Sequence, residues 1–216
     1  KSSVFMVYAR YTKRYPWLFF LVIVGAFGVQ AAMLIGPLYW REFINLLVEG
    51  DRQAVPALVS LLGIMIAIWT TNWAAERVRY FSTVHLEAKV MPDLMRGAFT
   101  HLIDHSYNFF VSQFAGSLTH RVNKFSRAYE TLFDSIIVNF VPTTLFVIGA
   151  IAILWTRNAT LGAALAVWTM LFLIFQYFVS RIRRPARAAR AAAETRVTAS
   201  LADAISNQAT ITLFSG

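Results

Sequence analysis

The residues of this chain that could do chemistry are few, and two histidines come first. His101 and His105 are four residues apart, which puts both imidazoles on one face of a helix, where they could share a metal ion. Four-span membrane oxidases and desaturases carry histidine boxes of this kind, but they need several boxes and this chain has only four histidines. Solvated histidines are therefore the preferred interpretation, and a four-span membrane metalloenzyme stays an alternative.

The sequence lacks the residues that two other kinds of chemistry need. The chain has no cysteine, so it offers neither a disulfide framework nor a thiolate metal site. It also has no Gly-x-x-x-x-Gly-Lys-Ser/Thr loop, whose backbone amides cradle nucleotide phosphates. We expect no catalytic residues in this segment and no metal or cofactor bound by it.

Composition places the chain in a membrane. Hydrophobic residues make up 57% of its 216 residues and charged residues only 14%, which leaves more apolar surface than one soluble core of this size needs. The formal net charge is +9, but the basic residues lie between long apolar runs and form no single soluble face. We interpret them as signals of membrane topology and expect no nucleic-acid partner.

Four apolar stretches predict an all-α membrane protein. A spanning helix needs about 20 consecutive apolar residues. Each stretch has this length and contains no Asp, Glu, Lys or Arg. The four predicted spans are residues 17–39, 56–75, 136–156 and 159–180.

The distribution of Lys and Arg predicts the orientation of these spans. The basic tail before Trp17 has four such residues, the segment 76–135 has seven, and the part after Ser180 has six. The loops 40–55 and 157–158 have two and one. Because Lys and Arg concentrate in cytoplasmic segments, we expect both termini and the long middle segment in the cytoplasm. The expected location of the spans is a bacterial inner membrane or a plasma membrane.

Two of the predicted spans continue as helices beyond the membrane. From Glu76 to about Tyr107, apolar residues recur at near-helical intervals without a Gly-, Ser- or Pro-rich run. After the fourth span, a narrow Ala-rich stripe steps by three or four residues toward Ile205, and Pro185 is expected to kink that helix. A polar helical approach over 117–135 precedes the third span.

The cytoplasmic ends of these helices carry the most specific patterns. In the first, over about residues 107–119, the aromatic pair Phe109 and Phe110 could fill an apolar pocket on a partner protein. Gly116 would let the chain leave one helix in a conformation closed to most residues, and Ser117 or Thr119 could cap the next helix. The second end, residues 203–214, is polar and helix-like.

Together these two ends resemble the first and second coupling segments of ATP-binding-cassette (ABC) exporters of type 1. The residues that carry the resemblance, and that it implies would contact the ATPase domain, are Phe109, Phe110, Gly116, Ser117, Arg121, Asp203, Ser206, Asn207, Thr210 and Phe214. The resemblance covers residues 1–216 and implies the exporter transmembrane fold, with the first four spans and both coupling segments present. We expect a piece of a longer protein, about two thirds of a transmembrane domain.

The resemblance also implies partners and a mechanism. A nucleotide-binding domain, on the same or a separate chain, would bind ATP and Mg²⁺. A second transmembrane half, identical or different, would complete the path through the membrane lipid. ATP-driven alternating access would then move a hydrophobic or amphipathic substrate such as a drug, lipid or peptide. A non-catalytic membrane scaffold stays a further alternative.

Four polar residues in or near the spans are candidates for the translocation path. Such side chains either hydrogen-bond between helices or line a cavity, and the sequence leaves both roles open. They are Gln30, Asn72, Asn139 and Gln176.

Overall fold

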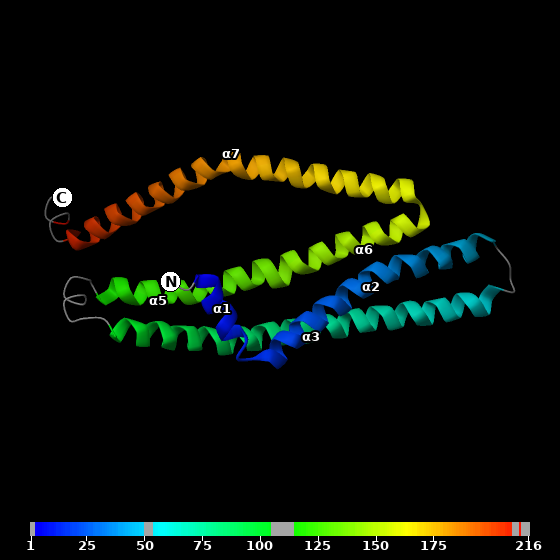
Figure 1. Cartoon of the computed structure of the whole chain (residues 1–216), viewed down its shortest axis with the longest axis horizontal. Coiled ribbons are helices and arrows are strands. Elements are labelled where there is room, and N and C mark those ends of the chain that lie inside the picture. Colours follow the sequence, from blue (N-terminus) through cyan, green and yellow to red (C-terminus); the bar gives the residue numbers. More distant parts are fainter. Residues whose placement is uncertain (1–2, 50–53, 105–114, 209–211, 213–216) are drawn as a thin grey trace. The chain divides into compact units, whose positions relative to one another are not determined.

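The computed structural model describes residues 3–49, 54–104, 115–208 and 212, and every regular element among them is a helix. Two units, residues 1–152 and 153–216, are described separately below. The elements are α1 (Val4–Thr12), α2 (Pro16–Glu49), α3 (Val55–Ile103), α5 (Ala115–Phe133), the π-helix η2 (Asp134–Phe140), α6 (Val141–Arg157) and α7 (Ala159–Ser206) (Figure 1).

Four helical segments are long and apolar enough to cross a membrane. They are α2, α3, the continuous run Leu118–Arg157, and α7. Each contains one of the apolar stretches found in the sequence. The helix α3 has 49 residues and α7 has 48, so at 1.5 Å per residue each is about 70 Å long. The predicted helical continuation of the second and fourth apolar stretches is confirmed.

The helix α2 is longer than the sequence indicated. A loop was expected over residues 40–55, but α2 continues to Glu49 and α3 begins at Val55. Pro37 lies inside α2 without ending it, because the lost N–H removes a single hydrogen bond and the residues that follow are mostly good helix formers. Pro56, in the first turn of α3, suits a helix start because the N–H that it lacks would have no helical partner there.

Glycine allows α2 and α3 to pack closely in the first unit. A Cβ added at Gly25 would lie 2.8 Å from Cβ of Arg79 and 2.9 Å from the carbonyl oxygen of Ala75. At Gly28, one turn later, it would lie 3.0 Å from Cβ of Ala75. Small residues at one helix crossing are typical of membrane helices, where close backbone approach supplies the packing energy.

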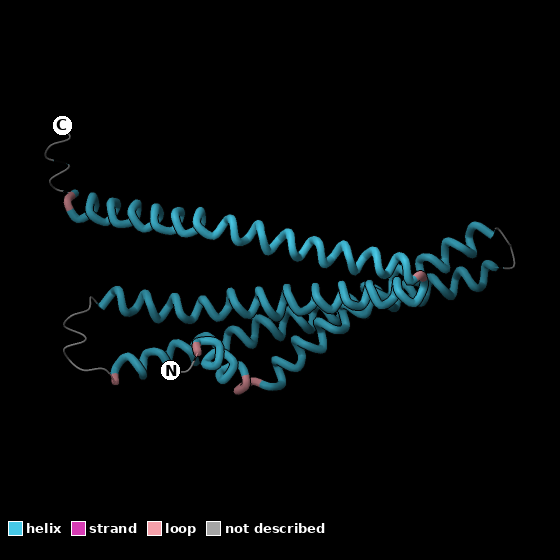
Figure 2. Tube along the Cα trace, turned by 45° about the horizontal axis from the view of Figure 1, so that its top comes forward, coloured by secondary structure: helices cyan, strands magenta, loops and turns pink. Residues whose placement is uncertain are grey.

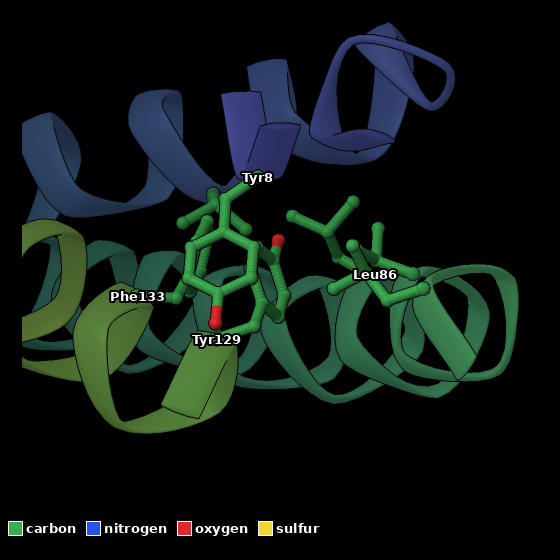
Figure 3. Packing of buried hydrophobic residues seen from close by; sticks show 7 residues of the cluster. Tyr8, Leu86, Tyr129 and Phe133 are labelled. Carbon is green, nitrogen blue, oxygen red and sulfur yellow. The ribbon is translucent and has the colours of Figure 1, made fainter. Parts of the chain in front are cut away.

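The best-buried cluster of the first unit joins α1, α2, α3 and α5. Leu86 and Val90 of α3 and Val22 of α2 are fully buried, and Tyr8 of α1 packs against Tyr129 and Phe133 (Figure 3). The rings of Tyr8 and Tyr129 meet edge to face with centroids 5.5 Å apart. Only a basic tail was expected before Trp17, so α1 is a feature that the sequence did not predict.

A π-helix joins α5 to α6 and was not expected from the sequence. In η2 the N–H of Val141 bonds to the carbonyl of Ile136, five residues back. Pro142 has no N–H to offer the carbonyl of Val138 four residues earlier. Nη1 of Arg79 on α3 donates to that oxygen at 3.3 Å, so a side chain supplies it with a donor that Pro142 lacks.

The second unit consists of the end of α6 and the helix α7. Asn158 separates the two helices, and its side-chain oxygen accepts hydrogen bonds from the N–H groups of Thr160 and Leu161. Gly162 lies close to the backbone of Trp155. A Cβ added at Gly162 would be 2.7 Å from Cα of Trp155. Pro185 lies inside α7 and does not end it. Figure 2 shows this part of the chain as one continuous helix.

Candidate functional site

A pocket of about 510 Å³ lies among α2, α3 and α6 in the first unit. Its volume is within the range of about 300–1,000 Å³ that is usual for small-molecule sites. Indole and phenyl rings make up much of its wall. The lining residues are Ala32, Met33, Gly36, Pro37, Trp40, Ile68, Trp69, Asn72 and Phe146.

Local backbone chemistry helps to form this pocket. A Cβ added at Gly36 would meet no other atom within 4 Å, so the missing side chain leaves open space in the wall. Pro37 has no N–H, so the carbonyl of Met33 lacks the donor that an α-helix normally supplies four residues later. On this side of the pocket, Gly36 therefore leaves open space, and the carbonyl of Met33 is an acceptor to which residue 37 cannot donate.

Asn72 is the polar side chain among the lining residues. Its Oδ1 atom is buried and has no hydrogen-bond partner in the described part of the chain. A buried acceptor without a partner costs about 1–3 kcal/mol, and an N–H or O–H donor on a bound molecule would recover that energy. The amide and the aromatic wall together suit an amphipathic molecule that carries a donor.

The other three candidates for the path have different surroundings. Gln30 lies on α2, partly exposed and outside the lining of this pocket. Asn139 lies in η2, where its Nδ2 donates to the carbonyl of Asp134 at 2.8 Å. Gln176 is exposed on α7 in the second unit. The structure thus gives Asn72 a place in a pocket and gives Asn139 a local hydrogen bond within its own helix.

The first coupling segment is described only at its end. Residues 105–114, including Phe109 and Phe110, lie outside the described residues. The helix α5 begins at Ala115, so Gly116 and Ser117 lie in its first turn. The expectation that Gly116 leaves the helical conformation and that Ser117 caps the helix from outside is therefore wrong. The helix simply starts earlier. Arg121 is exposed and forms no ion pair with a described carboxylate.

The second coupling segment contains the end of α7. Asp203 and Ser206 are in its last turn, and Asn207 follows as the C-cap residue. Nδ2 of Asn207 donates to the backbone oxygen of Asp203 and to its carboxylate, both at 3.0 Å. The backbone N–H of Asn207 also donates to the Asp203 carbonyl at 3.0 Å, so the side chain adds two hydrogen bonds to the one that closes the helix. Thr210 and Phe214 lie outside the described residues.

The proposed histidine pair is described only in part. His101 is in the last turn of α3, and His105 lies outside the described residues. Within residues 3–49, 54–104, 115–208 and 212, no group of three His, Cys, Asp or Glu side chains could hold a metal ion.

A carboxylate cluster lies where α3 meets α5 and η2, and the sequence analysis missed it. Glu87 is twelve residues beyond Ala75, the last residue of the second predicted span. Burial, together with the nearby carboxylates of Asp134 and Glu130, raises the pKa of its carboxyl to about 7. Its Oε1 atom is buried with no hydrogen-bond partner among the described residues. This contact is therefore sensitive to pH near neutrality.

Thermal stability should fall as the pH rises through this range. The pKa of Glu87 is higher in the folded state than its ordinary value of 4.5, so below about pH 4.5 the carboxyl is protonated in both states and carries no penalty. The folded state becomes less favourable as the pH rises toward 7, where the buried carboxyl must ionise beside Asp134. Glu87→Gln should raise the melting temperature of the complete transporter at pH 8 and change it little at pH 5.

The exposed Glu42 of α2 supplies the control for this measurement. Glu42→Gln should leave the dependence of melting temperature on pH as it is in the parent protein. If Glu87→Gln kept the parent's full loss of stability between pH 5 and pH 8, the assignment of that loss to Glu87 would be wrong.

Comparison with known proteins relates the chain to a family of membrane transporters. A family model described as "ABC transporter transmembrane region" matches residues 19–216. A protein of Bacillus subtilis (strain 168), named "Uncharacterized ABC transporter ATP-binding protein YknV", is 28% identical over 171 residues, which cover 78% of this chain and 27% of that protein. The chain thus corresponds to about a quarter of the length of this relative.

Proposed function

Because this chain belongs to the family of ABC transporter transmembrane regions, we propose that it is the transmembrane part of an ATP-driven exporter. It is an integral membrane protein with the all-α fold of such domains. The proposed exporter moves a hydrophobic or amphipathic substrate, such as a drug, lipid or peptide, across a bacterial inner membrane or a plasma membrane by alternating access.

The observation that carries this proposal is the length of two helices. The hydrocarbon core of a membrane is about 30 Å thick, whereas α3 and α7 are each about 70 Å long. Each helix therefore extends well beyond the membrane as a continuous rod. A rod that joins a membrane span to a distant tip suits the transmission of movement from a soluble domain.

The soluble partner in this proposal is a nucleotide-binding domain, on the same chain or another, that binds ATP and Mg²⁺. It contacts both coupling segments, which lie with the N-terminus in the cytoplasm. ATP favours one of two arrangements of the transporter, and the long helices carry that shift to the spans. A second transmembrane half, identical or different, completes the path.

The pocket around Asn72 is the part of this chain that we assign to the substrate. Its aromatic wall supplies apolar contact, and the Asn72 amide oxygen accepts a hydrogen bond from the substrate. No charged residue is among the lining residues, so the pocket does not require a charged group of a particular sign.

Substitution of Trp69 should weaken the response to substrate. Trp69→Ala removes an aromatic wall of the pocket, and a loss of about 1.4 kcal/mol would weaken binding about tenfold. The measurement is the substrate concentration that half-maximally stimulates ATP hydrolysis by the complete transporter in liposomes. A fluorescent phospholipid, a hydrophobic cationic dye and an apolar peptide serve as probes.

Trp73 is the matched control on the same helix. Trp69 is 66% exposed and lines the pocket, whereas Trp73 is 60% exposed and lies outside the pocket lining. Trp73→Ala should change the half-stimulating concentration less than twofold. Equal effects of the two substitutions for every probe would remove the pocket from the proposal, and no stimulation of the parent protein by any probe would contradict the proposed substrate class.

A further inference from the structure

A second pocket, of about 390 Å³, lies between the N-terminal helix α1 and the segment formed by α5 and η2. Three of its residues, Tyr8, Tyr129 and Phe133, also belong to the buried cluster, in which Tyr8 comes from α1 and the other two from α5 (Figure 3). The lining residues are Phe5, Tyr8, Ala9, Thr12, Lys13, Pro16, Phe19, Tyr129, Leu132, Phe133, Ile136 and Ile137.

The hydroxyl groups of the lining are bonded to one another or to the backbone. The Tyr8 hydroxyl donates to the carbonyl of Phe125 at 2.7 Å. Oγ1 of Thr12 donates to the carbonyl of Tyr8 at 2.9 Å and lies 3.0 Å from the Tyr129 hydroxyl, with which it shares a hydrogen bond. These groups already have partners, so the pocket offers an apolar wall that suits a hydrocarbon chain.

A positive charge lies at this apolar wall. Lys13 is an exposed lining residue, and Arg10 is exposed one helical turn earlier. Neither forms an ion pair with a carboxylate in the described part of the chain, and α1 itself contains no Asp or Glu. Arg14, by contrast, lies 3.6 Å from Asp93 of α3. Lys13 and Arg10 are thus the cations that remain for an anionic ligand.

The place of α1 in the chain puts this pocket at a boundary between polar and apolar surroundings. Residues 13–15 connect α1 to α2, whose uncharged apolar stretch begins at Trp17. Phe5 and Met6 of α1 are exposed, at 63% and 58%. A short helix with exposed apolar side chains and a basic end, directly before a membrane span, suits the membrane interface.

We propose that this pocket binds an anionic phospholipid, with one acyl chain against the apolar wall and the phosphate beside Lys13. A second copy of the chain or another apolar span would fill the same volume but would bury the Lys13 ammonium against hydrocarbon, which is costly without a partner. A phosphate supplies that partner, and an anionic headgroup also favours the nearby Arg10.

The experiment uses the complete transporter in lipid nanodiscs and needs no transport activity. Phosphatidylglycerol and phosphatidylcholine carry the same photoreactive group near the end of one acyl chain, and mass spectrometry locates the adducts. We expect several-fold more labelling of residues 5–19 and 129–137 by phosphatidylglycerol than by phosphatidylcholine. Lys13→Gln should lower the phosphatidylglycerol labelling to the phosphatidylcholine level, whereas Lys124→Gln, which alters an exposed lysine outside the pocket lining, should not.

Two variants that fill the pocket test its position. Ala9→Trp and Leu132→Trp each add volume at a lining residue and should remove the labelling by both lipids. Ala88→Trp, at an exposed residue of α3 outside the pocket lining, should not. Equal labelling by the two lipids in the parent protein would overturn the preference for anionic lipid. Labelling that persists in both filled variants, or an absence of any adduct in these segments, would overturn the site itself.

Discussion

Replacement of Gly25 by leucine is expected to prevent the close packing of α2 and α3 and to remove most of the folded transporter. The first atom of any side chain at this position would lie 2.9 Å from the carbonyl oxygen of Ala75 and 2.9 Å from the backbone nitrogen of Arg79. These are backbone atoms of a 49-residue helix, so they cannot move aside as the end of a flexible side chain would.

The expected cost is large for one substitution. Overpacking of a well-packed core typically costs about 1–3 kcal/mol, and an obstacle made of backbone atoms places Gly25→Leu at or above the upper end. The measurements are the yield of monodisperse transporter after detergent extraction and its melting temperature.

The control for this prediction is another glycine of the same helix pair. A Cβ added at Gly63 in α3 would have no atom within 4 Å, so Gly63→Leu should give near-parental yield and melting temperature. Comparable yields and melting temperatures for Gly25→Leu and the parent protein would show that the α2–α3 crossing does not depend on this glycine.

Apolar length and helical periodicity were enough to predict the long helices. The uncharged stretches locate the apolar parts of the four membrane-crossing segments, and the spacing after Glu76 predicts that α3 continues far beyond its span. A short connection at 157–158 was also expected; Arg157 belongs to α6, so Asn158 alone separates the helices, and its side chain caps α7. These features depend on neighbouring residues in the chain, which the sequence displays directly.

The features that the sequence analysis missed depend on contacts between distant segments. The π-helix η2 is accompanied by a hydrogen bond from Arg79, 59 residues away, to the carbonyl of Val138. Pro142 was visible in the sequence, but the side chain that compensates for its missing N–H was not. The helix α1 is only nine residues long, and it packs through Tyr8 against residues more than a hundred positions later.

The two pockets could not be predicted from the sequence either, because they too depend on contacts between distant segments. Asn72 was a candidate for the translocation path, but nothing in the sequence placed Trp40 and Phe146 beside it. Lys13 was read as a topology signal, and only the packing of α1 against α5 gives it an apolar neighbour. A signal for α1 was present in the spacing of Phe5, Tyr8 and Thr12, which recur at helical intervals.

Phe110→Ala in the complete transporter is expected to abolish most of the substrate-stimulated ATP hydrolysis. The proposal seats this ring in an apolar groove of the nucleotide-binding domain. Truncation of an aromatic residue at the centre of such a contact commonly costs about 2 kcal/mol or more, which corresponds to a roughly 30-fold weaker contact. Phe110 lies outside the described residues, so this prediction depends on the resemblance of residues 107–119 to a coupling segment.

The control is Phe99→Ala, which removes a ring from α3 that is 57% exposed and lies before the coupling segment. It should leave the stimulated rate close to that of the parent. Phe110→Tyr keeps the ring and should retain most of the stimulation. An unchanged rate in Phe110→Ala, in protein of normal yield, would remove Phe110 from the coupling contact.

The most direct test of the central claim is a cross-link from the end of α7. Asn207→Cys in the complete transporter, with other cysteines removed, carries a photoreactive maleimide, and mass spectrometry identifies the partner with and without ATP and Mg²⁺. Ser180→Cys, far earlier on the same helix at the end of the fourth predicted span, is the control. We predict a nucleotide-dependent adduct between residue 207 and a nucleotide-binding domain, expected to be that of the opposite half, and none from residue 180. Adducts of residue 207 with lipid or membrane helices alone would contradict the claim that this chain transmits the movement of an ATPase.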